Sequence, residues 1–366
     1  MLNCHEFLSE ILYLLPDTDL QYPNLQMKPD SDGLSGLPVF FIVGRGRSGS
    51  TLLRSCFDAH PNVAIPAESR FVQYLFYRYH HIKKWTPELA MKAISDAGKD
   101  FEPLGLDHRK VFELVKKHHH NLSFQIVCKI IYLSASATAG NKDIVCIGDK
   151  NPRYTFFISQ LIRIFPDAKF IHLIRDYRAN ALTITKAARD IGEIRSVPVA
   201  IARWKYYNSI IDKMKKKFPR RFYTLRYEDL VIEPEKILRN LCKFVGLEFN
   251  AAMLNYEGRL DSYFHDPSFS KLHQSLKKPF NTSKVSEWQK KLSRHDIMIC
   301  ETMAAGYGKK YGYQPSMTLS TIERTACSIV YSPLALTGKV RFMLKRYFYH
   351  CPFLMRIFYS IIIRLK

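Results

Sequence analysis

Short apolar runs alternate with longer segments of helical periodicity between residues 38 and 246. The run Pro38–Val43, with the sequence PVFFIV, predicts a buried strand, and a helix is expected from Ser50 to Ala59. Three later strands are expected over residues 143–148, 168–176 and 220–230, each followed by a helix, at about 154–165, 178–189 and 233–246. Because strands alternate with helices, the pattern predicts an α/β fold with a parallel sheet and helices on both faces.

The regions outside this alternation have different patterns. Residues 1–37 predict a short amphipathic helix followed by a linker rich in Pro, Asp, Gly and Ser. Residues 70–142 contain only helical patterns and predict a helical insert within a main domain of residues 38–315. Residues 316–366 predict a helical tail. From Lys339 onward this tail carries seven Lys or Arg residues, no acidic residue and many large apolar side chains.

The composition of the chain is strongly basic. Its 366 residues have a formal net charge of +22, with 55 Lys and Arg against 33 Asp and Glu. Such an excess favours a polyanionic ligand, an anionic membrane surface or nucleic acid, and the charge alone does not choose among them. The eight cysteines are scattered without a CxxC pair, so we expect buried reduced thiols and no metal site.

The sequence predicts neither a signal peptide nor a membrane-spanning segment. The first twenty residues include Glu6 and Glu10 and lack a basic start, which argues against a signal peptide. No stretch reaches the roughly 18 to 20 apolar residues that span a bilayer. We therefore expect a cytoplasmic protein, with a peripheral contact at the inner face of an anionic membrane through the basic apolar tail, residues 339–366.

A glycine-rich turn, residues 44–51 with the sequence GRGRSGST, joins the first strand to its helix. A turn of this kind directs backbone N–H groups at an anion, and the helix dipole adds to the attraction. Three glycines give the dinucleotide spacing GxGxxG, with Glu68 about where a ribose-binding acid would lie. The same stretch has Walker A spacing, but Ser50 stands where the lysine of a P-loop kinase would be. An incidental strand-to-helix turn is a further alternative.

Basic residues follow two other predicted strands. Lys150 lies just after the second strand, and Arg175 ends the third. Because ligands of open α/β sheets bind at the carboxyl ends of the strands, Arg47, Lys150 and Arg175 are expected to converge on one edge. No acidic residue closes the third strand in the usual metal-holding context. The pattern therefore indicates a nucleotide with more than one anionic group, held by cations without Mg²⁺.

Four ordered motifs resemble the family of sulfotransferases that use 3′-phosphoadenylyl sulfate (PAPS). The turn Arg47-Ser48-Gly49-Ser50-Thr51, followed by His60-Pro61, is similar to their 5′-phosphosulfate loop. The other three motifs lie at residues 170–184 (FIHLIRDYRANALTI), 226–247 (RYEDLVIEPEKILRNLCKFVGL) and 281–292 (NTSKVSEWQKKL). The resemblance covers roughly residues 38–292. The arginine in the loop is similar to the branch that contains tyrosylprotein and many bacterial sulfotransferases.

The resemblance implies a P-loop-like α/β fold and an enzyme of the EC 2.8.2 type. Such an enzyme moves a sulfuryl group in line from PAPS to an acceptor hydroxyl and releases adenosine 3′,5′-bisphosphate (PAP). By resemblance, Arg47 and Lys150 stabilise the leaving phosphate and Glu68, 21 residues after Arg47, is the base; Ser286 matches a late catalytic serine. The implied donor-binding residues are Arg45, Gly46, Arg47, Ser48, Gly49, Ser50, Thr51, Arg175, Thr183 and Tyr227.

The acceptor is not encoded by any of these motifs. A basic apolar tail without an export signal favours a glycan or glycolipid at the inner membrane face, with tyrosine in a peptide or a small metabolite as alternatives. A different class, a basic nucleic-acid-binding protein, is suggested by the charge and by aromatic residues among the basic ones at 70–85. No RRM, KH or zinc-finger pattern supports that class, so no nucleic acid is expected.

Overall fold

The computed structural model describes residues 33–100, 104–135, 143–190, 196–257 and 280–350. The predicted N-terminal helix and most of the predicted linker lie outside these residues, as do the last sixteen residues of the predicted tail. Six cysteines of the described part, at positions 56, 128, 146, 242, 300 and 327, are buried free thiols, as expected. Cys4 and Cys351 lie outside it.

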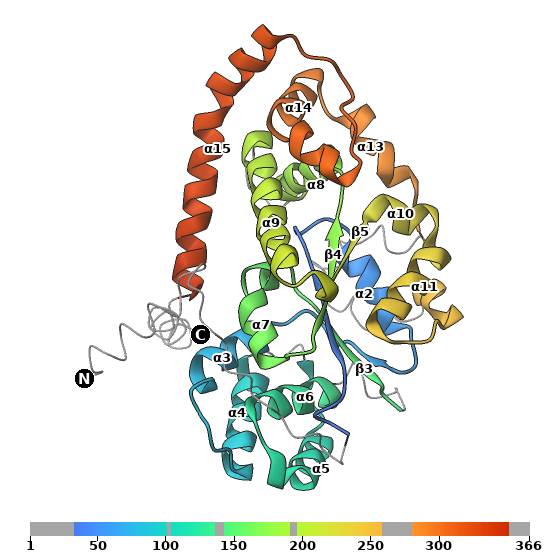
Figure 1. The fold of residues 1–366 in the computed structure, drawn as a ribbon, viewed down its shortest axis with the longest axis vertical. Coiled ribbons are helices and arrows are strands. Elements are labelled where there is room, and N and C mark those ends of the chain that lie inside the picture. Colours follow the sequence, from blue (N-terminus) through green and yellow to red (C-terminus); the bar gives the residue numbers. More distant parts are fainter. Residues whose placement is uncertain (1–32, 101–103, 136–142, 191–195, 258–279, 351–366) are drawn as a thin grey trace, which may run out of the picture.

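A five-stranded parallel sheet lies at the centre of the described part (Figure 1), with the order β2-β3-β1-β4-β5. The strands are β1 (Val39–Val43), β2 (Val63–Ala64), β3 (Cys146–Lys150), β4 (Lys169–Ile174) and β5 (Phe222–Arg226). Strand β1 therefore lies between β3 and β4, and the chain moves from one side of it to the other. This switch of strand order is where open α/β sheets bind ligands.

Alternating side chains of β1 pack on opposite faces of the sheet, as the period of a strand requires. On one face the ring of Phe41 stacks on Phe170, with centroids 5.6 Å apart, and Phe170 stacks on Phe222 at 4.9 Å. On the other face the ring of Phe40 packs against Phe57 of α2 at 4.6 Å. All residues of β1 are buried, which explains why the run is apolar throughout.

Helices cover both faces of the sheet (Figure 1). One face packs against α7 (Ile158–Ile164) and the end of α9 (Val197–Lys217), and the other against α2 (Ser50–Asp58), α10 (Tyr227–Ile232) and α11 (Pro234–Val245). Between β2 and β3 the chain is helical: α3 (Phe71–Tyr79), α4 (Pro87–Asp100), α5 (His108–Lys117), η2 (His119–Asn121) and α6 (Phe124–Ser134). The predicted fold class, a P-loop-like α/β sheet with a helical insert, is confirmed.

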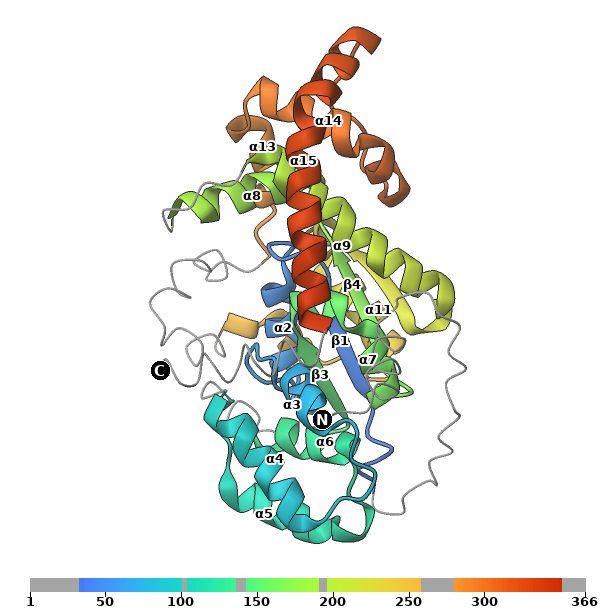
Figure 2. The same ribbon diagram turned by 90° about the vertical axis from the view of Figure 1, so that its left-hand side faces the viewer.

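The remaining helices form a layer beyond the carboxyl edge of the sheet and along one side. They are α8 (Tyr177–Asp190), α13 (Ser283–Lys291), α14 (Arg294–Gly308) and α15 (Thr321–His350). Short 3-10 segments connect the elements: η4 (Pro152–Phe156), η5 (Pro219–Arg221), η6 (Ala251–Leu254) and η9 (Lys309–Tyr311). Helix α15 runs beside α9 along the outside of the molecule, so Figure 2 shows it in front of the other elements.

Several elements differ from the sequence prediction. The strand expected over 220–230 ends at Arg226 and is followed by α10, and β2 was not predicted. Strand β3 begins at Cys146 and ends at Lys150, whereas the apolar run placed it at 143–148. Pairing with β1, which aligns Ile42 with Lys150, sets this boundary, because a central strand can hold polar residues that find partners. The helix expected over 154–165 is instead a 3-10 turn followed by α7.

Candidate active site

The glycine-rich turn has a shape that its two outer glycines make possible. At Gly49, with φ of 94°, a Cβ atom would lie 2.3 Å from Cδ2 of Tyr227. At Gly44, with φ of 151°, it would lie 2.3 Å from the carbonyl oxygen of Leu173. Between them Arg47 has a left-handed backbone, with φ of 68°, which is uncommon for a residue with a side chain. Such a conformation persists when the surrounding structure fixes it.

Two side chains from other elements, Thr155 and Asn180, fix the turn. Thr155 accepts a hydrogen bond from the amide of Gly44 at 3.2 Å. The side-chain amide of Asn180 donates to the carbonyl of Gly46 at 3.1 Å and to Oγ of Ser48 at 3.2 Å. Two separate elements therefore fix the turn: η4, which follows β3, and α8.

Sequence reasoning missed both Asn180 and Thr155. Neither resembles a ligand-binding residue, because each acts on the protein backbone. The signal available for Asn180 is its place in an apolar stretch of the helix after β4, with Ala179 and Ala181 on either side. An asparagine that is fully buried needs hydrogen-bond partners, and the turn supplies them.

Helix α2 starts directly after the turn, with Gly49 as its N-cap. The first N–H groups of any helix lack intrahelical partners, and at this end no side chain caps them. Ser50 and Thr51, both half-buried, form the first turn of this helix. Arg45 lies at the other side of the turn, with its guanidinium 5.0 Å from the centre of the Tyr207 ring. The geometry is that of an anion-binding helix N-terminus.

Lys150 and Glu68 form an ion pair at the carboxyl edge of the sheet. Lys150 is the last residue of β3, level with Ile42 of β1, and its ammonium donates to Oε2 of Glu68. The lysine side chain is only 3% exposed, whereas the glutamate side chain is 43% exposed. A buried cation is thus matched by a carboxylate that solvent and ligands can reach.

Two buried side chains, Arg54 and Asn151, hold the backbone of the segment that carries Glu68. Arg54 of α2 donates to the carbonyls of Pro66 at 2.8 Å and Ile65 at 2.9 Å. Asn151, directly after β3, donates to the carbonyl of Ser69 at 2.7 Å. These bonds fix the backbone on both sides of Glu68, so its carboxylate is positioned although it is exposed.

Two other side chains that could accept a proton, Asp149 and His60, are buried. Asp149 is 1% exposed, and Tyr132 donates to its Oδ2 at 2.5 Å. Burial raises the pKa of Asp149 to about 7, and the hydrogen bond from Tyr132 opposes that rise. His60 is 3% exposed, and its ring nitrogens contact the carbonyl of Glu248 and the amide of Asn62. Of Asp149, His60 and Glu68, Glu68 is by far the most exposed to solvent.

Arg175 follows β4 and contacts two of the predicted site segments. It donates to the carbonyl of Arg47 at 3.4 Å and to the carbonyl of Lys284, in α13, at 2.8 Å. Its guanidinium lies 4.4 Å from the centre of the Tyr227 ring, and that ring in turn fills the space beside Gly49. The structure therefore brings Arg175, Tyr227 and the glycine-rich turn together.

A second, deeper ion-pair network lies next to Arg175. Arg178 binds Asp176 at 2.6 Å and Glu301 of α14 at 2.9 Å, and its guanidinium lies 4.1 Å from the centre of the Trp288 ring. Glu228 accepts a hydrogen bond from the amide of Asp176 at 3.0 Å. All four charged side chains are buried. This network ties α8, α13, α14 and α10 together behind the site.

Two predicted residues are not connected to the turn by these contacts. Thr183 uses its hydroxyl to donate to the carbonyl of Ala179 at 2.8 Å, within α8. Ser286 is exposed on α13, next to Glu287, which pairs with Lys284 and Lys291. The roles given to Thr183 and Ser286 by resemblance stay predictions.

The chemistry of the site suits an anion better than a metal ion. Its described groups are mainly donors: the first amides of α2 and the side chains of Arg47, Lys150 and Arg175. Within the described ranges, no group of three or more His, Cys, Asp or Glu residues is arranged to hold a metal ion. Lys150 and Arg175 follow the two strands that flank β1, which fits a ligand with two anionic groups.

Comparison with known proteins places this site in a family. Protein-tyrosine sulfotransferase 1 of Danio rerio is 29% identical over 296 residues, 76% of this chain and 73% of that protein. The omega-hydroxy-beta-dihydromenaquinone-9 sulfotransferase Stf3 of Mycobacterium bovis is 34% identical over 128 residues, 32% of each chain. A solved sulfotransferase domain from the Synechococcus PCC 7002 olefin synthase covers 81% of this chain and 94% of its own, with 22% identity and a TM-score of 0.44. The family model described as "Sulfotransferase family" matches residues 38–251, and the chain therefore belongs to the sulfotransferase family.

Proposed function

We propose that the enzyme transfers a sulfuryl group from PAPS to an acceptor hydroxyl and releases PAP. The observation that carries this proposal is the Lys150–Glu68 ion pair beside the glycine-rich turn. It combines a buried cation with an accessible carboxylate at the carboxyl edge of the sheet. Sulfuryl transfer needs both, because negative charge grows on the leaving phosphate while the acceptor hydroxyl loses a proton.

The donor would be held by groups on both sides of β1. The amides of Gly49, Ser50 and Thr51, the two hydroxyls and Arg47 would bind its 5′-phosphosulfate. Arg175, together with Thr183, would bind its 3′-phosphate, and the contact between Arg175 and the turn supports a single continuous site. When bound, the donor supplies the sulfuryl group.

The catalytic roles are divided among three side chains. Arg47 and Lys150 stabilise negative charge on the leaving phosphate, and Glu68 accepts the proton of the acceptor hydroxyl. The 43% exposure of the Glu68 side chain supports this role, since an acceptor must reach the base. The burial of Asp149 and His60 argues against either of them as the base.

For the acceptor, we place the hydroxyl of tyrosine in a peptide first. The relatives that match about three quarters of this chain are protein-tyrosine sulfotransferases. The relative named for a menaquinone substrate matches only 32% of it. A glycan or glycolipid, which the basic apolar tail favours, is the second candidate. A panel of tyrosine peptides, glycolipids and small phenols, each offered with labelled PAPS, ranks these classes directly.

The proposed donor can be tested without knowing the acceptor. PAP should raise the melting temperature of the enzyme, and adenosine 5′-monophosphate, which lacks the 3′-phosphate, should raise it much less. Arg175→Ala should shrink that difference. Arg47→Ala should lower sulfate transfer at saturating donor by roughly 10²- to 10³-fold, the usual effect of losing one group that stabilises transition-state charge. Salt-sensitive RNA binding without any response to PAP would instead support a nucleic-acid-binding protein.

A further inference from the structure

Helix α15 has two apolar faces that point in opposite directions. One face packs on α9: Cys327 and Ala335 are buried, and a Cβ at Gly338 would lie 2.9 Å from Cγ1 of Val199. The large apolar side chains on the other face are exposed. Their exposed fractions are 81% for Ile322, 70% for Ile329, 58% for Leu336, 45% for Val340 and 47% for Met343.

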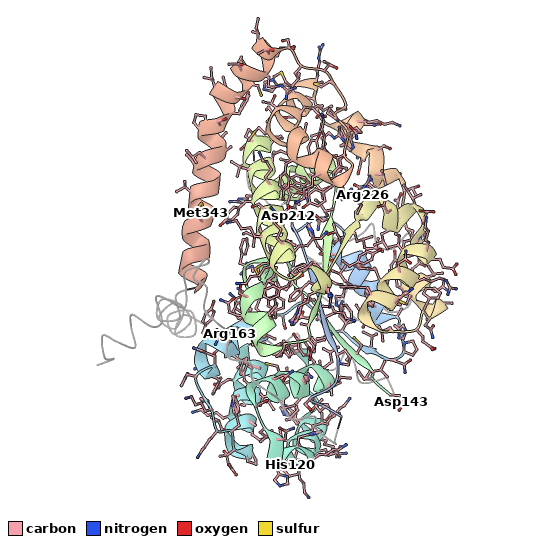
Figure 3. The ribbon with its side chains drawn as sticks, in the orientation of Figure 1. His120, Asp143, Arg163, Asp212, Arg226 and Met343 are labelled. Atoms are coloured by element: carbon pink, nitrogen blue, oxygen red, sulfur yellow. The ribbon has the colours of Figure 1, made fainter. Side chains whose placement is uncertain are left out.

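The exposed residues form a continuous stripe. Ile322, Ile329, Leu336 and Met343 recur every seven residues, so they lie two helical turns apart on one side of the helix. Figure 2 shows α15 in front of the other elements, and Met343, labelled in Figure 3, lies toward the C-terminal end of the helix. An apolar stripe of this length on a surface helix indicates a site that binds a membrane or another protein.

We propose that the outer face of α15, the stripe from Ile322 to Met343, lies on an anionic lipid membrane. The charge of the helix supports this partner. Lys339, Arg341, Lys345 and Arg346 follow the first half of the stripe, and Glu323 is the only acidic residue of the helix sequence. Helices that lie in a membrane interface combine an apolar face with such basic residues.

The same charges disfavour a second copy of the chain as the partner. Paired helices of a coiled coil are usually matched by acidic and basic residues beside the apolar seam. Here the sequence of α15 has five basic residues and one glutamate, and each chain carries a net charge of +22. Among the described residues, no helix is both long and apolar enough to cross a bilayer. The helix would therefore lie along the membrane surface.

The test is a flotation assay with the full-length protein. Vesicles containing phosphatidylglycerol are compared with vesicles of phosphatidylcholine alone, at low and high salt. The test variant carries Ile322→Ser, Ile329→Ser and Leu336→Ser. The matched control carries Phe112→Ser, Val145→Ser and Ile232→Ser, which removes three large apolar side chains of 60%, 50% and 59% exposure elsewhere on the surface.

Wild type and the matched control should float with the anionic vesicles, and high salt should weaken this binding. The α15 variant should bind more than about tenfold more weakly, because three large apolar side chains no longer leave water on binding. PAP should still raise its melting temperature, which shows that the fold and the donor site are intact. Equal flotation of the variant and wild type overturns the proposal. So does a wild-type dimer in sedimentation that the α15 variant loses, since a second copy would then cover the stripe. Neither outcome depends on the proposed reaction.

Discussion

Two ion-pair systems lie at the ends of β3 and β4, the strands on either side of β1, and they differ in how far solvent can reach them. After β3, the buried ammonium of Lys150 pairs with one carboxylate, Glu68, whose side chain is 43% exposed. After β4, the guanidinium of Arg178 pairs with Asp176 and Glu301, whose side chains are 9% and 2% exposed. In the first system, solvent reaches the carboxylate of the pair. The second is closed by protein on every described side.

From this difference we expect the first ion pair to serve the reaction and the second to stabilise the fold. An accessible carboxylate beside a buried cation can change partner or gain a proton at little cost to the fold. A buried cation that holds two buried carboxylates cannot, since removing any member leaves an uncompensated charge in a medium of low polarity. We therefore expect substitutions in the first system to affect turnover, and substitutions in the second to affect stability.

The largest effect is expected for Glu68→Gln. Loss of the proposed general base should lower single-turnover sulfuryl transfer at saturating donor by roughly 10²- to 10⁴-fold. The amide keeps the shape and can still accept the hydrogen bond from Lys150, so the melting temperature and the dissociation constant of PAP should stay near wild type. Transfer within a few fold of wild type would show that Glu68 is not the base.

Arg178→Ala should produce the opposite pattern. It leaves Asp176 and Glu301 buried without their cation, and breaking a buried ion pair in this way typically costs about 3–5 kcal/mol of unfolding free energy. The matched control is Arg239→Ala, which removes an ion pair with Glu235 that is more than half exposed on both sides. That control should cost less than about 1 kcal/mol in denaturant unfolding. Equal losses in the two variants would contradict the closed network.

Asn180→Ala tests whether the turn needs its buried anchor. The substitution leaves the carbonyl of Gly46 without this donor, so we expect a loss of about 1–3 kcal/mol in stability. Asn208→Ala is the matched control: Asn208 is equally buried but binds His172 at 2.8 Å, away from the turn. Both variants should lose stability, but only Asn180→Ala should raise the KM for PAPS. An unchanged KM in both would remove Asn180 from the positioning of the turn.

The smallest effect is expected for Asp149→Asn and concerns pH. The pKa of Asp149 is about 7 in the folded protein, above the ordinary value of 3.8, so unfolding releases a proton between these values. Its contribution to stability is therefore full below about pH 4 and is lost as pH rises through 7. Denaturant unfolding at pH 5 and pH 8 should show a smaller loss for the asparagine variant than for wild type. An identical loss would mean that other groups carry it.

The sequence predicts the sheet and the glycine-rich turn better than it predicts the side chains that hold the turn in place. The apolar run of β1 and the glycine spacing indicated the central strand and the turn, because both follow from local rules. The end of β3 was misplaced, because pairing with β1 brings the polar residues Asp149 and Lys150 into the strand. Asn180 and Asn151 bind backbone carbonyls that are far away in the chain, and no local pattern encodes such contacts.

The left-handed backbone of Arg47 has a consequence for how this loop can change. Glycine adopts that conformation without the cost that a side chain adds, so Arg47→Gly should be tolerated by the fold better than Arg47→Ala. If Arg47→Gly raises the melting temperature, the same change also removes a cation proposed to act in catalysis, so thermal stability and activity would then oppose each other at this position.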